Sequence, residues 1–196
     1  MHRTKPVLIG SISAGCALLM FLGACSRKGN TGVEKPIVFF APAIVTNVPE
    51  VYKPLYLGNL SADQVEAFRA ALPYDSISLE RTTASGSNLL YRVTFHRAGQ
   101  AEYEVFQPNH HQATGQIDLF TFGRLCYALD SGGFKDFQTK YRANPFENAA
   151  TLVTVSKGKN TKTVANYGAI GPIQLWATEE AIDGVRVRTD WKLVQK

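Results

Sequence analysis

The sequence predicts an α+β domain, with an antiparallel sheet of about five strands and two or three helices packed on one face. Apolar and polar residues alternate in five short segments, which is the period of a half-buried strand. Other segments repeat apolar residues at spacings of three and four, as a helix does. The strand segments come in pairs separated by short glycine-containing turns, and such pairs favour antiparallel neighbours.

The first 24 residues resemble an export signal. Two basic residues, Arg3 and Lys5, precede an uncharged apolar run over residues 7–22, which is long enough for a secretory core and short for a membrane span. The run ends in Leu22-Gly23-Ala24-Cys25, which resembles a lipobox, the motif whose cysteine is lipidated before cleavage. This resemblance implies a lipoprotein that loses residues 1–24 and is held to a membrane by lipid on Cys25. The alternatives are a secreted protein cleaved at a small-residue site and an uncleaved anchor helix.

The residues after Cys25 indicate where such a lipoprotein is sorted. In bacteria with two membranes, an aspartate at the next position retains a lipoprotein in the inner membrane. Ser26 therefore implies the outer membrane, facing the periplasm. Residues 25–35 are polar and contain two glycines, so they are predicted to form a flexible tether.

The charge of the chain excludes one class of partner. Removing Arg3 and Lys5 lowers the formal net charge from +5 to +3, which is too mild for a nucleic-acid-binding surface. We therefore expect contact with a membrane through Cys25, an envelope protein or cell-wall component as partner, and no nucleic acid.

Residues 36–76 are predicted to form an extended proline-containing segment followed by a helix. Four prolines in its first part exclude a helix and a central strand, and allow a short strand at Ile37–Phe40. Ser61 and Gln64 have the spacing of a capping box. A helix is therefore predicted over residues 61–72.

Residues 77–196 are predicted to form the α+β domain itself. Alternation places its strands at about 77–81, 91–95, 102–106, 151–156 and 162–167. Helical spacing predicts a helix at about 119–130, in which Cys126 lies on the apolar stripe and is interpreted as a buried residue, not a nucleophile. Pro172 is predicted to begin the last helix and Gly184 to end it. The tail 185–196 stays open between strand and helix.

The order of these features resembles a known family. A strand that ends in arginine, a turn, a glycine hairpin, a helix with a Phe/Leu stripe, a lysine-bearing hairpin and a Pro-Leu helix follow one another between Ile77 and Trp191. This arrangement resembles the uncharacterised bacterial family known as domain of unknown function 6438. The matching positions are Arg81, Gly86, Tyr91, Val93, Gly99, Tyr103, Gly115, Phe122, Leu125, Phe134, Phe137, Tyr141, Lys162, Val164, Pro172, Leu175, Ile182 and Trp191.

The turn after the first strand departs from the family. Two cysteines and a proline of the family pattern are replaced here by Ala84, Asn88 and Leu89. The spacing is kept, so we expect the turn to persist without a disulfide. The resemblance implies a fold and an envelope address, and it implies no activity.

The candidate binding surface consists of Arg81, Gly86, Asn88, His110 and His111. An arginine in a strand that faces a core needs a carboxylate partner and could equally gate an anion site. Adjacent histidines in a strand point to opposite faces, so the histidine pair is interpreted as a solvated loop and no metal or cofactor is expected.

Three interpretations of function stay open. The first and preferred one is a non-catalytic envelope module that binds another envelope protein or a cell-wall component, with no catalytic residue. The second is a small hydrolase-like periplasmic enzyme that uses Arg81, Glu102, His110 or His111. The third is a structural lipoprotein without a specific ligand. The pair Glu179-Glu180 is assigned to an exposed helix face.

Overall fold

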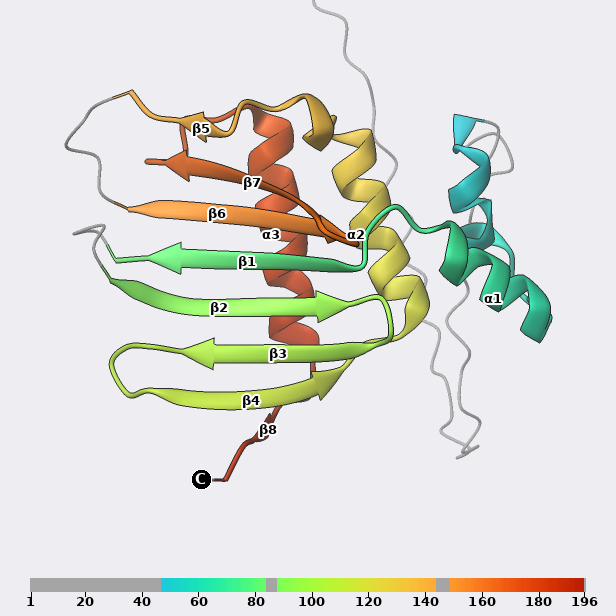
Figure 1. Ribbon diagram of the computed structural model, residues 1–196, viewed down its shortest axis with the longest axis horizontal. Helices are drawn as coiled ribbons and strands as arrows, with labels where there is room; N and C mark the ends of the chain where they lie inside the picture. The colour runs from blue at the N-terminus through green and yellow to red at the C-terminus, as the bar shows by residue number, and fades with distance from the viewer. Residues whose placement is uncertain (1–46, 84–87, 144–148, 196) are drawn as a thin grey trace, which may run out of the picture. The chain divides into compact units, whose positions relative to one another are not determined.

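The computed structural model describes residues 47–83, 88–143 and 149–195. Its centre is an eight-stranded sheet, and helices α2 and α3 lie across one face of that sheet (Figure 1). The strand order is β5-β7-β6-β1-β2-β3-β4-β8, and neighbours are antiparallel except for β5 and β7, which are parallel. The predicted α+β class is confirmed, whereas the prediction of about five strands is too low.

Five of the eight strands match the predicted ones. The strands are β1 Ser76–Thr82, β2 Leu89–His96, β3 Gln100–Val105, β4 His111–Gln116, β5 Lys140–Tyr141, β6 Ala150–Lys157, β7 Asn160–Tyr167 and β8 Lys192–Leu193. The prediction lacks β4, β5 and β8. The strands β5 and β8 have two residues each, and β4 consists of polar and small residues in which no apolar alternation is visible.

Before the sheet, the chain forms two helical segments. Helix α1, Ala62–Ala71, begins with the predicted capping box: the Gln64 amide donates to Ser61 Oγ, and the Ser61 amide donates to Gln64 Oε1 at 2.8 Å. The 3-10 helix η2, Glu50–Tyr56, lies in the segment that was predicted to be extended. That prediction is wrong because proline removes only one donor, and its fixed φ is compatible with a 3-10 turn, so the helix accommodates Pro54. The predicted strand at Ile37–Phe40 lies outside the described residues.

Helices α2 and α3 cover the sheet. Helix α2, Leu119–Ser131, matches the predicted helix, and the short 3-10 helix η3, Phe134–Asp136, follows it. Helix α3, Ile173–Arg188, continues past Gly184, so the predicted stop there is wrong. The next residue, Val185, packs against the core and favours one further turn. The tail therefore contains both alternatives, a helix to Arg188 and then the short strand β8.

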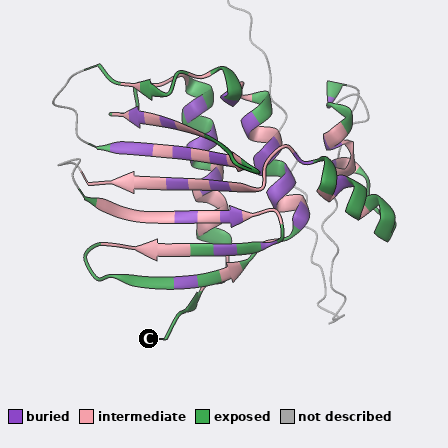
Figure 2. Ribbon diagram, in the orientation of Figure 1, coloured by how far each residue is buried: buried purple, intermediate pink, exposed green. Residues whose placement is uncertain are grey.

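The core fills the space between the sheet and the two helices (Figure 2). Its fully buried members include Ile77, Leu79, Val93, Phe95, Phe122, Leu129, Val153, Val164, Leu175 and Ile182. Cys126 is also fully buried, which confirms its interpretation as a core residue, and burial raises the pKa of its thiol. In the part of the chain that the structure describes, no helix is both long and apolar enough to cross a bilayer.

The opposite face of the sheet is polar. Residues that alternate with the core positions form hydroxyl pairs across neighbouring strands: Ser78 with Thr94 at 2.9 Å, and Thr154 with Thr163 at 2.9 Å. None of the helices described by the structure covers this face (Figure 1). This one-sided arrangement is typical of antiparallel sheets that face water.

Candidate functional site

Polar side chains form a row on the helix-covered face of the sheet. Across four neighbouring strands, Asn166, Thr151, Arg81 and Tyr91 occupy paired positions. The adjacent row towards the middle of the sheet is apolar, with Val164, Val153, Leu79 and Val93 in the same register. Helix α3 crosses this polar row, so its side chains there must satisfy buried polar groups.

Arg81 is the centre of the row. Its Nε donates to Asp183 Oδ2 at 2.7 Å, its Nη1 to Thr151 Oγ1 at 3.0 Å, and its Nη2 to Glu180 Oε1 at 3.1 Å. The carboxylate partner expected from the sequence is therefore present on α3. With three of its nitrogens engaged, Arg81 is committed to the fold and is a poor candidate for binding an external anion.

Asp183 holds the other side of this ion pair. It also accepts from Tyr91 Oη at 2.6 Å and from Arg186 Nε at 2.8 Å. Burial raises the pKa of the Asp183 carboxyl, but the hydrogen bonds from Tyr91, Arg186 and Arg81 outweigh burial and leave the pKa below its ordinary value. Burial and the hydrogen bond to Asp183 raise the pKa of the Tyr91 hydroxyl to about 12. The cluster is thus a fixed ionic network that joins α3 to the sheet.

Aromatic side chains complete the network at its β3 end. The Arg186 guanidinium lies 4.6 Å from the ring centroid of Tyr91 and 5.5 Å from that of Tyr103. Tyr103 in turn lies 5.2 Å from Trp191, whose Nε1 donates to the Arg186 carbonyl at 2.9 Å. These contacts fix the segment between α3 and β8 against the sheet.

Glu179 is buried, contrary to the interpretation of Glu179-Glu180 as an exposed pair. Its exposed fraction is 2%, whereas the Glu180 side chain is 50% exposed. Glu179 Oε1 accepts from Asn166 Nδ2 at 2.9 Å, and burial raises the pKa of its carboxyl to about 7. The pair differs because adjacent helix positions point about 100° apart: Glu179 points into the buried row beside Asn166, whereas Glu180 lies at the margin and reaches Arg81 from the solvent side.

The two predicted histidines lie on opposite sides of the sheet. His110 Nε2 is 2.9 Å from Glu104 Oε1 on the open face. The His111 ring instead contacts the ring of Tyr103, with centroids 6.5 Å apart, on the helix-covered side. His111 begins β4, so the prediction of a loop is wrong for this residue. Within the described ranges, no group of three or more His, Cys, Asp or Glu residues could hold a metal ion.

None of the other described residues that the sequence suggested for a binding or catalytic site lies beside Arg81. Asn88 is exposed in the turn before β2, where its carbonyl accepts from the Thr83 amide at 2.8 Å. Glu102 lies on the open face, 3.5 Å from His96 Nε2. Gly86 and the proposed lipidation site Cys25 lie outside the described residues. The candidate surface is therefore divided between two faces.

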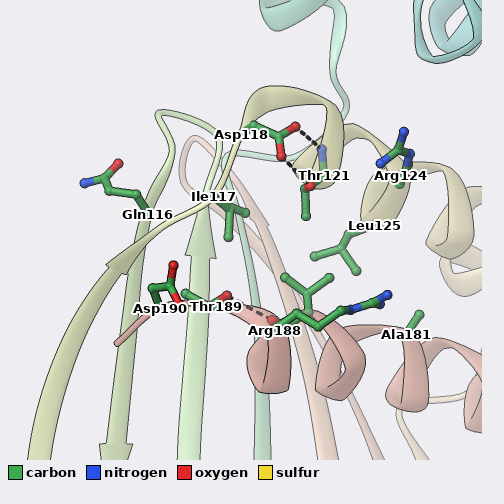
Figure 3. Close-up of a pocket in the computed structure, with 11 residues that line it drawn as sticks. Gln116, Ile117, Asp118, Thr121, Arg124, Leu125, Ala181, Arg188, Thr189 and Asp190 are labelled. Atoms are coloured by element: carbon green, nitrogen blue, oxygen red, sulfur yellow. Dashed lines mark hydrogen bonds between the residues drawn. The ribbon is translucent and has the colours of Figure 1, made fainter. Parts of the chain in front are cut away.

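A pocket of about 470 Å³ opens between α2, α3 and the segments at the end of β4 (Figure 3). Its middle is apolar, with Ile117 before α2, Leu125 on α2, and Ala181 and Val185 on α3. This volume lies within the range of small-molecule sites.

Charged groups border this pocket at two ends. Arg124 on α2 and Arg188 on α3 lie towards one end, and Asp118 and Asp190 lie towards the other (Figure 3). Asp118 caps α2 by accepting from the Thr121 amide at 2.8 Å and from Thr121 Oγ1 at 2.6 Å. Burial opposes these hydrogen bonds, but they leave the pKa of Asp118 below its ordinary value.

The two arginines are not neutralised by described carboxylates. The Arg124 side chain makes no hydrogen bond or ion pair with any described residue, and the Arg188 side chain makes one, from its Nε to the Gly184 carbonyl at 2.8 Å. None of the residues predicted from the sequence as a binding surface lines this pocket. An exposed arginine on a helix has no distinguishing sequence signal, because most such residues are simply solvated.

The fold is an α+β domain in which a mostly antiparallel sheet carries two helices across one face. The family model described as Domain of unknown function (DUF6438) matches residues 75–186, and the chain belongs to this family. The matched range runs from the start of β1 into α3, and so includes both Arg81 and Asp183. No curated protein matches the chain.

Proposed function

We propose that this protein is a lipid-anchored envelope module that binds a partner without converting it chemically. The observation that carries this proposal is the pocket between α2 and α3. Its two arginines, Arg124 and Arg188, have no carboxylate partner among the described residues, and its lining contains neither histidine nor cysteine. A pocket of this kind can hold an anionic group by charge-assisted hydrogen bonds.

The geometry does not favour the alternative, a periplasmic hydrolase. Arg81 lies on the helix-covered face, whereas Glu102 and His110 lie on the open face. Groups on opposite faces of a sheet cannot act on one substrate. We therefore retain the binding module as the proposed function.

The proposed lipid anchor on Cys25 is argued from the sequence alone. Its test is metabolic labelling with palmitate in a bacterial host, followed by membrane fractionation. The unaltered chain should take up label and sediment with membranes, whereas Cys25→Ala should do neither. Cys16→Ala is the matched control and should behave as the unaltered chain does. Label on Cys25→Ala would refute lipidation at Cys25.

The sorting signal has a separate test. On a density gradient, the unaltered lipoprotein should be found with the outer membrane, and Ser26→Asp should move it to the inner membrane. An unaltered chain that is found with the inner membrane would refute the proposed location.

The partner is sought by crosslinking in intact cells. We expect one reproducible envelope partner, whose yield falls when Arg124 and Arg188 are both changed to Gln. Absence of any partner at good crosslinking yield would refute the binding module.

A further inference from the structure

The pocket between α2 and α3 presents opposite charges across an apolar middle. Its basic end comes from two separate helices, with Arg124 on α2 and Arg188 on α3. Its acidic end comes from Asp118, which caps α2, and from Asp190, which follows α3. Because the four formal charges cancel, neither a strongly anionic nor a strongly cationic ligand is complementary to the whole pocket.

The basic end suits a carboxylate. A guanidinium offers a planar fork of donors that matches the two oxygens of a carboxylate. Arg188 is held in place by the hydrogen bond from its Nε to the Gly184 carbonyl, which leaves its two terminal nitrogens available. Arg124 adds a second guanidinium from the facing helix.

The acidic end suits an ammonium group. The side chain of Asp190 is exposed and makes no hydrogen bond or ion pair with another described residue. Asp118 keeps its negative charge, since its hydrogen bonds with Thr121 favour the ionised form. A donor-rich cation would be the complementary partner of these oxygens.

We propose that this pocket binds a short zwitterionic peptide, with its carboxylate end at Arg124 and Arg188 and its ammonium end at Asp190. The apolar middle, formed by Ile117, Leu125 and Val185, accepts an aliphatic side chain of that peptide. This inference rests on the proposed binding function and specifies its ligand. The C-terminus of a whole protein would also place a carboxylate at the arginines, but it would place no ammonium group at Asp190. Peptides with and without a free N-terminus therefore distinguish a short peptide from a protein C-terminus as the ligand.

The probe is the tripeptide Ala-Leu-Ala in three forms, unmodified, amidated at the C-terminus and acetylated at the N-terminus. Binding to the detergent-solubilised full chain is measured by isothermal titration calorimetry. The unmodified peptide should bind, amidation should weaken binding by about tenfold or more, and acetylation should weaken it by about threefold or more. Equal binding of all three forms would overturn the proposal.

Variants assign each end of the peptide to its residues. Arg124→Gln and Arg188→Gln should each weaken binding of the unmodified peptide by about fivefold or more. Asp190→Asn should abolish the preference for the unmodified over the acetylated form. Lys159→Gln, an exposed cation at the β6–β7 turn, is the matched control and should bind as the unaltered chain does. Thermal unfolding confirms that each variant is folded.

The outcomes distinguish this inference from the proposed function. If the tripeptide does not bind but crosslinking captures a partner that depends on the two arginines, the ligand class is wrong and the binding module stands. A preference for the acetylated form would assign the pocket to protein chain ends and also overturn the inference. Absence of both peptide binding and a crosslinked partner would refute both proposals.

Discussion

Arg81 on β1 and Asp183 on α3 are 102 residues apart in the chain and meet at 2.7 Å, through Nε and Nη2 on one side and Oδ2 on the other. Asp183 also receives hydrogen bonds from Tyr91 on β2 and from Arg186 in its own helix. One carboxylate therefore links α3 to two adjacent strands. This link determines where α3 crosses the sheet, and so where its other side borders the pocket.

Removing that carboxylate should destabilise the domain. Asp183→Asn removes the more buried of the two carboxylates that pair with Arg81, and the expected loss in the free energy of unfolding is about 2–4 kcal/mol. Glu180→Gln removes the more exposed partner of the same Arg81 and should cost less than about 1 kcal/mol. Urea unfolding at pH 7 measures both variants. Equal losses would mean that Asp183 has no special role.

Glu179 should make the protein less stable as the pH rises. Burial raises the pKa of this carboxyl from 4.5 to about 7, so between these values the folded state keeps a proton that the unfolded state has released. The free energy of unfolding therefore falls from about pH 4.5 to about pH 7, and stays lowered above that range.

The variant Glu179→Gln tests this pH dependence. It keeps an oxygen that can accept from Asn166, but it cannot ionise. At pH 8 it should be more stable than the unaltered protein by roughly 3 kcal/mol, and at pH 4 the two should be similar. Urea unfolding at the two pH values decides the matter. A constant difference between the proteins would show that Glu179 does not titrate as expected.

Gly123 allows α1 and η2 to approach α2 closely. A Cβ at this position would lie 2.6 Å from Phe68 Cζ and 3.0 Å from Leu55 Cδ2. Although alanine is the better helix former, we expect Gly123→Ala to destabilise the domain by about 1 kcal/mol, because overpacking outweighs the gain. Gly58→Ala, whose Cβ would have no neighbour within 4 Å, should be nearly neutral. Thermal unfolding of both variants provides the comparison.

Cys126 should be chemically inert in the folded protein. Its side chain is fully buried, and burial together with the nearby Asp130 raises the pKa of the thiol. Because the thiolate is the reactive form, a maleimide should label it only after unfolding. A chain carrying Cys16→Ser and Cys25→Ser isolates this one thiol. Rapid labelling without denaturant would contradict the buried position.

The sequence located the parts of the fold whose signals are local. Alternation identified the strands that pack on the core, and the spacing of Ser61 and Gln64 identified the start of α1. Strand β4 escaped detection because its residues on the helix-covered side include Ala113 and Gly115. Gly115 has to be small, since a Cβ there would lie 2.6 Å from Thr189 Cγ2. This requirement comes from a distant segment and leaves no local pattern.

The candidate site likewise combines features that have a local sequence signal with features that depend on distant segments. The sequence indicated that Arg81 needs a carboxylate, but only the fold selects Asp183 among 16 acidic residues. It could not distinguish buried Glu179 from exposed Glu180 without the orientation of α3. The pocket depends on the approach of two helices, so its arginines carry no signal in the sequence alone.

The sheet ends on both sides in a strand of two residues, β5 beyond β7 and β8 beyond β4. A long unpaired margin would act as a template on which a neighbouring copy could add its own strand. Strands this short offer too few free backbone groups for such an addition. The two short edge strands therefore disfavour strand-by-strand polymerisation of copies of this domain through the sheet.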